Sequence, residues 1–259
     1  MLEDEIRRAR RHKDLLIMTH IVIGYPSFRE SFALARIMAE AGVDLMELQI
    51  PFSEPMADGP VILTANQKAL EAGATVGKCM EFARELASHV TIPLVFMSYY
   101  NIPFKYGVAR FAADTRRAGL LGTIVPDLPP EEADDYTSAL EAEGLAGVGL
   151  FAPNTPEERM RQIAERSSGM IYCVARKGVT GAPTDFSAEL TEYLTRARRA
   201  TDLPLGIGFG IKSRSDVDFV RGKVDVAIIG SESLRVSRES GLRATRDFIA
   251  SLTGAPQHS

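Results

Sequence analysis

Short runs of apolar and β-branched residues recur along this chain, and segments with helix signals separate them. Strands that alternate with helices build parallel sheets, because a parallel neighbour is reached only through a long crossover connection. The pattern therefore predicts an α/β protein with about eight strands. We expect them at residues 17–23, 45–50, 94–98, 123–125, 146–150, 170–174, 205–208 and 226–229.

Capping residues mark several of the intervening helices. Thr155 is expected to cap a helix that has Pro156 at its first position and acids after it. Gly42 and Gly119 are expected to end two others. These signals place helices between consecutive strands.

This alternation builds either an open doubly wound sheet or a closed barrel, and periodicity alone does not choose between them. The strand count, the length of 259 residues and unusual polar residues after strand ends favour a barrel. The first connection, residues 23–27, also lacks the Gly-x-Gly-x-x-Gly pattern of dinucleotide folds. We predict a single-domain (β/α)8 TIM barrel over residues 1–259, with extra helices near its phosphate loops.

The two ends of the chain differ in character. Residues 1–14 are expected to form a short N-terminal helical extension, with acids at its start and bases at its end as the helix dipole favours. Residues 253–259 are polar and lack periodicity, so we expect a flexible tail.

Composition excludes several classes of function. A net charge of −4 gives no basic footprint for nucleic acid. No stretch reaches the roughly 18 apolar residues of a membrane span, and the charged start lacks the apolar core of a secretion signal. Cys79 and Cys173 stand far apart without metal-ligand spacing, as reduced thiols in a cytoplasmic protein would. We therefore expect a cytoplasmic protein without a metal site.

Two acids stand out in residues 47–60. Glu47 lies in an expected buried strand that Pro51 stops, and Asp58 follows in a loop rich in proline and apolar residues. A strand-end acid is often only a surface or capping residue, yet a buried carboxylate is costly unless it is paired or functional. Both acids are candidates for catalysis.

The last two expected strands end in glycine-rich segments. Gly206, Gly208 and Gly210 surround the exit of the seventh strand, and Gly230 with Ser231 follows the eighth. Such glycines either permit tight turns or let backbone N–H groups approach an anion, and a helix that starts at Ser231 adds its positive end. Barrels frequently bind a substrate phosphate at this place, so we predict a phosphate site.

A third candidate segment is residues 172–182, where a strand runs into a glycine-flanked loop with a basic tip. A loop of this length can serve as a lid over a site. It can equally be a simple strand-to-helix connection.

The sequence resembles the tryptophan synthase alpha chain family over nearly its whole length. The matching segments occur in the family's order, at residues 24–26, 47–60, 97–101, 125–129, 152–155, 172–181 and 206–211 with 230–231. Single glycine-rich pieces are weak signals, but their joint order is highly specific.

The resemblance implies a lyase that cleaves indole-3-glycerol phosphate to indole and glyceraldehyde 3-phosphate by a retro-aldol reaction. Glu47 matches the family's general acid/base, which protonates the indole ring carbon as the carbon–carbon bond breaks. Asp58 matches the acid that engages the indole N–H and stabilises positive charge on the ring. This division is chemically sound, and we expect Asp58 to stay ionised.

Further site residues are implied in the same way. Tyr172, Thr180, Phe209, Met97 and Tyr99 match substrate-binding positions, and Thr180 also matches a residue that fixes the second acid. Tyr172 alone could equally be a core tyrosine. The phosphate ligands that the resemblance implies are Gly181, Gly210, Gly230 and Ser231.

A partner is implied as well. The family pairs this subunit with a pyridoxal-phosphate beta chain, commonly as an α2β2 complex, and the alpha chain itself needs no cofactor. Residues 51–60, Asn101 and residues 127–129 match the region where that partner docks.

Two residues depart from the family pattern close to the first acid. Gln49 replaces a usual glycine and shares a strand face with Glu47, so we expect it to alter the pocket or to bond that acid. His20 replaces a usual Phe or Tyr of the indole pocket. Both place substrate fit in question, and we interpret His20 as a polar strand residue and not as a catalyst.

Glu54 and Met56 are milder departures in the loop that faces the partner, and they place partner affinity in question. Two alternative functions stay open at this point. One is a free-standing indole-releasing lyase, which keeps both acids and the phosphate loops. The other is a non-catalytic partner that binds ligand and stimulates the beta chain, against which the presence of both acids weighs.

Overall fold

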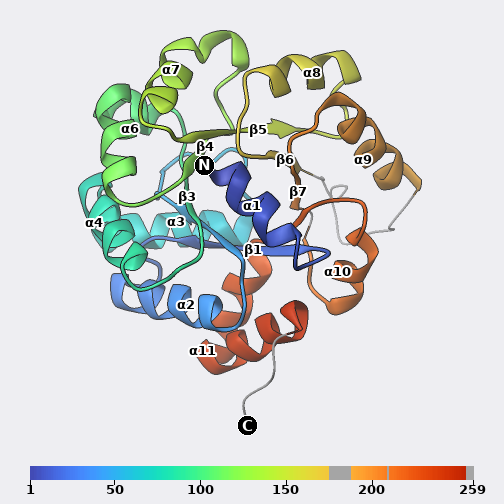
Figure 1. Cartoon of the computed structure of the whole chain (residues 1–259). Helices are drawn as coiled ribbons and strands as arrows, with labels where there is room; N and C mark the ends of the chain where they lie inside the picture. Colours follow the sequence, from blue (N-terminus) through green and yellow to red (C-terminus); the bar gives the residue numbers. More distant parts are fainter. Residues whose placement is uncertain (175–187, 209, 255–259) are drawn as a thin grey trace.

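The eight strands close into a parallel barrel in the order β1 to β8 (Figure 1). This computed structural model describes residues 1–174, 188–208 and 210–254. Each strand lies within a residue or two of its predicted place. The strands are β1 (Leu16–Val22), β2 (Leu45–Gln49), β3 (Leu94–Met97), β4 (Gly122–Ile124), β5 (Ala146–Phe151), β6 (Ile171–Val174), β7 (Leu205–Gly208) and β8 (Val226–Ile229).

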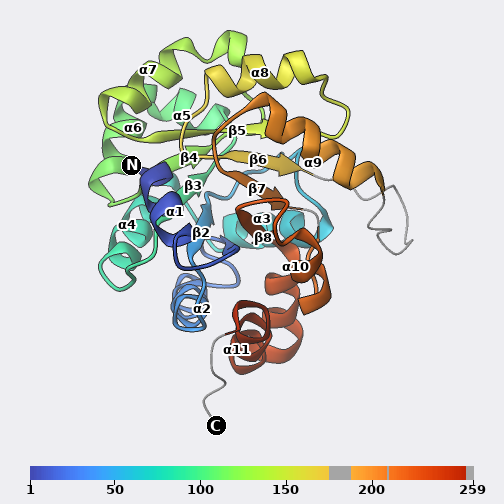
Figure 2. The same ribbon diagram turned by 45° about the vertical axis from the view of Figure 1, so that its right-hand side comes forward.

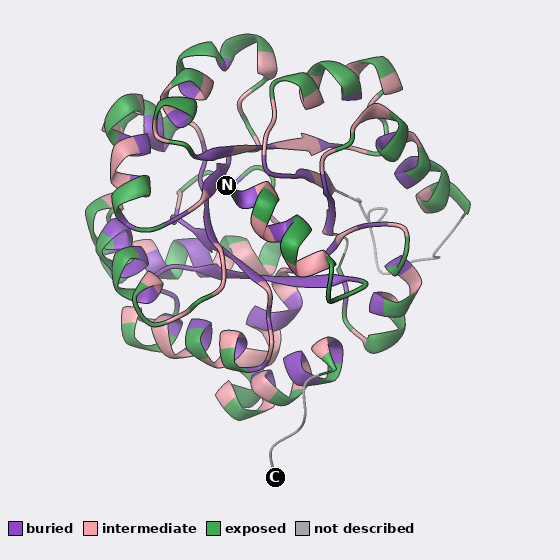
Figure 3. Ribbon diagram, viewed as in Figure 1, coloured by how far each residue is buried: buried purple, intermediate pink, exposed green. Residues whose placement is uncertain are grey.

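Helices surround the barrel and cover its outer face, and their outward sides are exposed (Figure 3). None of the helices in the described part of the chain is long and apolar enough to cross a membrane. The helices are α1 (Leu2–Arg10), α2 (Phe28–Glu40), α3 (Pro60–Glu71), α4 (Val76–Ala87), α5 (Asn101–Tyr106), α6 (Val108–Arg117), η1 (Pro130–Glu132), α7 (Asp134–Ala142), α8 (Glu157–Glu165), α9 (Ala188–Ala200), α10 (Arg214–Val220) and α11 (Ser231–Thr253).

Side chains alternate along each strand between the barrel interior and the helical layer. At the amino ends of the strands the interior is apolar, with Leu16 and Met18 in one cluster. Leu2 and Ile6 of α1 pack into the same cluster, so α1 closes that end of the barrel (Figures 1 and 2). The amino end is therefore sealed, and a site must open at the carboxyl end.

Three polar residues continue the interior faces toward the carboxyl ends. His20 follows Leu16 and Met18 at two-residue spacing on β1, and Glu47 and Gln49 follow in the same way on β2. All three side chains are buried, and His20 pairs opposite Glu47 in the parallel register. The barrel interior thus changes from apolar to polar along its axis.

Three local expectations differ from the structure. Thr155 does not cap α8: Pro156 holds that position, and the Thr155 hydroxyl accepts a hydrogen bond from the Ala152 N–H within the preceding turn. The stretch from Pro51 to Gly73 was expected to hold the loop with Asp58 and only a short extra helix, but it contains a full helix of 12 residues, α3. At the other end Thr253 still belongs to α11 and residue 254 caps it, while residues 255–259 lie outside the described part.

Candidate active site

Glu47 is a buried acid in the middle of β2, with only 4% of its surface exposed. The adjacent residues Met46 and Leu48 pack into the apolar layer between the strands and the helices. Because side chains alternate along a strand, the Glu47 carboxylate points into the barrel. One oxygen, Oε2, has no hydrogen-bond partner among the described residues. A buried charge with a free oxygen is costly, and such groups occur chiefly at functional sites.

His20 lies directly beside this acid. Its Nδ1 is 3.1 Å from Oε1 of Glu47, and both side chains are almost fully buried. Burial opposes protonation of the imidazole, but the Glu47 carboxylate, with smaller help from Asp58 and Gln49, outweighs it and raises the pKa of His20. The residue interpreted from sequence as a polar strand residue therefore contacts the candidate acid/base.

Asp58 is held above β2 by two side chains. Gln49 Nε2 donates to Asp58 Oδ2 at 2.7 Å, and the Tyr99 hydroxyl donates to the same oxygen at 3.1 Å. The Tyr99 oxygen also accepts the Ala57 N–H at 3.0 Å, while the Tyr99 ring stacks on Phe52. Tyr99 thus clamps the loop at two consecutive residues and fixes where Asp58 sits.

The surroundings of Asp58 shift its pKa. Burial raises the pKa of Asp58, and the hydrogen bonds from Gln49 and Tyr99 and the field of His20 oppose that rise only in part. The negative charge of Asp58 is therefore less favoured than that of a fully solvated aspartate.

Tyr172 extends from β6 into the same space. Burial, followed by the carboxylates of Glu47 and Asp58, raises its pKa well above the ordinary value. A Cβ at position 208 would come within 2.4 Å of the Tyr172 hydroxyl. Gly208 therefore leaves the space that the phenol occupies, just as Gly206 leaves space for Met170.

Met97 follows on β3, where it pairs in register with Gln49 and is buried in the interior cluster. Glu47, Asp58, Met97, Tyr99 and Tyr172 thus gather at the carboxyl end of the barrel. Three further predicted site residues, Thr180, Gly181 and Phe209, lie outside the described residues.

The predicted phosphate end contains Gly210, Gly230 and Ser231. Gly210 has a positive φ of 80°, which favours glycine. Gly230 precedes α11, which begins at Ser231, and no side chain caps this helix start. Uncapped N–H groups at a helix start suit an anion.

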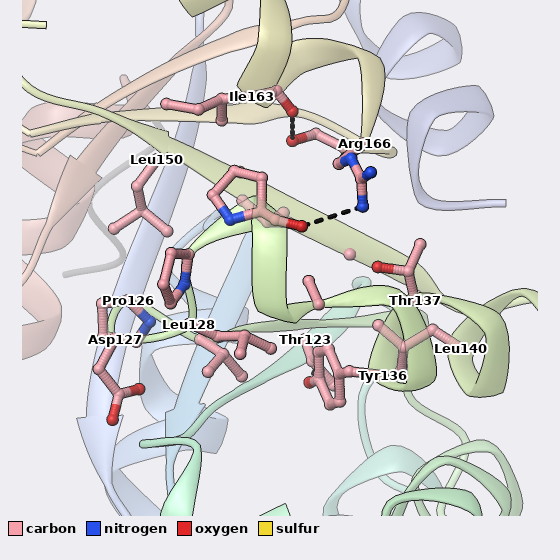
Figure 4. Close-up of a pocket in the computed structure, with 18 residues that line it drawn as sticks. Thr123, Pro126, Asp127, Leu128, Tyr136, Thr137, Leu140, Leu150, Ile163 and Arg166 are labelled. Carbon is pink, nitrogen blue, oxygen red and sulfur yellow. Dashed lines mark hydrogen bonds between the residues drawn. The ribbon is translucent and has the colours of Figure 1, made fainter. Parts of the chain in front are cut away.

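A separate pocket of about 370 Å³ lies outside the barrel wall, between β4, β5, α7 and α8 (Figure 4). Arg166 stands at one side of it and donates to the Pro130 carbonyl. Neither Glu47 nor Asp58 lines this pocket, so it is distinct from the candidate active site.

Sequence reasoning missed one residue that supports the loop. Asn66 on α3 is buried, and its side chain accepts the Phe52 N–H at 2.9 Å and donates to the Ile62 carbonyl. A polar amide on the buried face of a helix was the available signal. Asn66 anchors the start of the loop that carries Asp58.

Comparison with known proteins gives a consistent result. Residues 6–251 match the family model described as tryptophan synthase alpha chain. The tryptophan synthase alpha chain of Syntrophotalea carbinolica is 58% identical over 252 residues, which cover 97% of this chain and 100% of that protein. The alpha chain of Methanosarcina mazei is 40% identical over 239 residues, covering 92% of this chain and 87% of that protein.

Solved structures agree. A chain of Mycobacterium tuberculosis tryptophan synthase superposes with a TM-score of 0.91 at 32% identity, covering 98% of this chain and 96% of that one. A chain of the tryptophan synthase complex of Pyrococcus furiosus superposes with a TM-score of 0.84 at 28% identity, covering 92% and 98%.

Proposed function

Because this chain belongs to the tryptophan synthase alpha chain family, we propose that Glu47 and Asp58 perform the family's chemistry here. Enzymes of the family are lyases that cleave indole-3-glycerol phosphate to indole and glyceraldehyde 3-phosphate, and the indole serves L-tryptophan synthesis. The observation that carries the residue assignment is the placement of two carboxylates at the carboxyl end of the barrel: Glu47, which is buried with one free oxygen, and Asp58, which is partly buried.

In the proposed mechanism Glu47 first donates a proton to the ring carbon that bears the glycerol chain. The positive charge that develops on the ring is stabilised by Asp58, which accepts the indole N–H. The hydroxyl on the adjacent chain carbon then returns a proton to Glu47 as the carbon–carbon bond breaks. Its carbon becomes the aldehyde, and the bonding electrons restore the indole ring.

The raised pKa of Asp58 suits this role. A carboxylate whose charge is disfavoured in the empty site gains more from a cationic partner than a well-solvated one does. Met97 and Tyr172, at the sides of the same space, are proposed to hold the indole ring, while Tyr99 contributes mainly through Asp58.

We assign the phosphate group to Gly210, Gly230 and Ser231. The uncapped start of α11 offers backbone N–H groups and the positive end of the helix dipole. Gly181 completes this set as a prediction from the family resemblance. Binding of the phosphate there would orient the glycerol chain along the barrel mouth toward Glu47.

A beta chain is the proposed partner, in an α2β2 complex. Met56 in the loop after β2 is 86% exposed, and Phe104 on α5 is 66% exposed. These two side chains lie in or beside the segments that the family resemblance implies dock the partner, which supports the proposal. The steps above are two proton transfers and one carbon–carbon cleavage that side-chain acids can assist, so we propose that the alpha chain needs no cofactor and that pyridoxal phosphate belongs to the beta chain.

We also propose that the chain acts as one domain in the cytoplasm. The packing of Leu2 and Ile6 into the barrel interior supports a single folding unit. The two cysteines, Cys79 and Cys173, are buried and unpaired, which suits a reducing compartment.

The test is indole release from indole-3-glycerol phosphate by the purified chain, alone and with a beta subunit and serine. Slow release that the beta subunit accelerates is expected. Fast release without acceleration would favour a free-standing lyase. No release in either condition would contradict the proposed activity and favour a regulatory role.

A further inference from the structure

The contact between His20 and Glu47 gives one carboxylate oxygen a fixed partner. The two residues are register neighbours on β1 and β2, and Nδ1 lies 3.1 Å from Oε1. We infer that Nδ1 carries the hydrogen of this contact and that Oε1 accepts it. His20 is 3% exposed and Glu47 is 4% exposed, so water does not compete for this bond.

The unpartnered atoms show which way the pair is oriented. Glu47 Oε2, His20 Nε2 and Gln49 Oε1 are buried without a hydrogen-bond partner among the described residues. With Oε1 held by His20, Oε2 is the oxygen left for a substrate. The imidazole therefore fixes the rotation of the carboxylate that the proposed mechanism uses.

The groups around His20 also favour a proton on the pair. Glu47 faces His20 from β2, and Asp58 faces it from the following loop. The side-chain amide of Gln49 also acts to raise the pKa of His20. Tyr172 on β6 faces the same carboxylates, but its raised pKa keeps it neutral. Tyr99 beside Asp58 is likewise neutral, because burial followed by Asp58 raises its pKa. With two acids and no second cation among these groups, the surroundings favour the protonated form of the imidazole.

We propose that His20 is a positioning residue for Glu47, which fixes the carboxylate through Nδ1 and holds one proton on the His20–Glu47 pair for the reaction. The pair gives one proton to the indole ring carbon through Glu47 and regains one from the chain hydroxyl, so its proton count is unchanged after each turnover. This inference rests on the proposed role of Glu47.

The pH dependence of kcat tests this role, because a space-filling His20 would not move it. The wild-type chain, His20→Asn and His20→Phe are compared, with His12→Gln as the control at an exposed histidine. Asn keeps an N–H donor near the place of Nδ1 but cannot hold the proton, and Phe removes both.

We expect wild-type kcat to fall on the alkaline side at the pH where the His20 ring titrates in an NMR experiment. The chain has four histidines, so the His20 signal is identified by its loss in His20→Asn. In both variants the alkaline limb of kcat should move from its wild-type position by about one pH unit or more. His20→Phe should also lower kcat about tenfold or more, and His20→Asn should lower it less, because it retains the donor.

An alkaline limb that stays in place in both variants would overturn the proposal, as would a wild-type limb that does not follow the His20 titration. The second comparison needs no variant, so misfolding of His20→Phe does not leave the question open. Failure of the proposed function is distinguishable, because it appears as a wild-type chain that releases no indole or as a Glu47→Gln variant that keeps its activity.

Discussion

Gln49 donates its side-chain N–H to Asp58 Oδ2 at 2.7 Å, which joins the β2 strand to the loop that follows it. This contact fixes one candidate catalytic acid from the same strand that carries the other. The two acids are therefore placed relative to each other by a single short segment, residues 47–58.

Gln49→Glu tests that contact with little change in volume. The variant replaces the donor by a second carboxylate, and two acids that share a site cannot both ionise easily. We expect kcat to fall about tenfold or more and the free energy of unfolding to drop by about 1–3 kcal/mol in urea titrations. The matched control is Gln67→Glu at an exposed position of α3, and its loss of unfolding free energy should stay within about 0.5 kcal/mol. Equal effects at the two positions would argue against a special role for Gln49.

Tyr99→Phe removes the hydroxyl that bonds both Ala57 N–H and Asp58. The expected loss of unfolding free energy is about 0.5–1.5 kcal/mol, because two part-buried hydrogen bonds are lost. Indole release should also fall, since Asp58 is no longer fixed. Tyr136→Phe is a close control: its buried hydroxyl bonds Thr123 at 2.7 Å, away from both acids, so it should lose stability but keep kcat. Full activity in Tyr99→Phe would contradict the claim that the Tyr99 hydroxyl fixes the position of Asp58.

Asp58→Asn should separate stability from activity. The pKa of Asp58 is higher in the folded protein than in the unfolded chain. Its contribution to stability is therefore fully present below the pKa of the unfolded chain, and it is lost as the pH rises through the pKa of the folded protein. Asn can still accept from Gln49 or Tyr99 without carrying charge. The variant should therefore be more stable than wild type at pH 7.5, and the difference should shrink toward pH 4.5 in urea titrations.

The same variant should lose kcat by about a hundredfold or more, as expected when a group that stabilises transition-state charge is removed. A variant that is less stable than wild type at pH 7.5 would contradict the assigned pKa direction. A variant with unchanged kcat would contradict the role of Asp58 in the reaction.

Gly208→Ala introduces a Cβ that would lie 2.4 Å from the Tyr172 hydroxyl. Overpacking of this kind costs about 1–3 kcal/mol, and displacement of Tyr172 should lower kcat or raise KM. Gly77→Ala on α4 is the control: a Cβ there meets nothing within 4 Å, so the variant should match or exceed wild-type stability. The two variants are compared by thermal unfolding and by indole release.

The strands were predictable because an alternation of apolar runs and helix signals repeats eight times, and their positions determine which side chains point inward. The depth of Glu47 follows from that periodicity. The partner of Gln49 does not, because it depends on how the loop from Pro51 folds back over β2, and the partner of His20 depends on the register of β1 against β2. We expected Gln49 to alter the pocket or to bond Glu47, and it bonds Asp58 instead.

Glycines illustrate a second limit of sequence reasoning. The run after β7 was interpreted as freedom for tight turns or for an anion, and the positive φ of Gly210 agrees with that freedom. Gly206 and Gly208 have a different cause, since they leave space for Met170 and Tyr172 inside the barrel. Such a cause depends on the side chain of a neighbouring strand, which spacing along one strand does not reveal.

The most direct test of the account is kcat for indole release by Glu47→Gln, measured beside the affinity of the same variant for indole-3-glycerol phosphate. Glutamine keeps the shape of the side chain and an acceptor for His20 Nδ1 but cannot exchange a proton. The account predicts that turnover is abolished while substrate still binds with nearly wild-type affinity. Turnover close to wild type would contradict the central claim that Glu47 is the acid/base of this barrel.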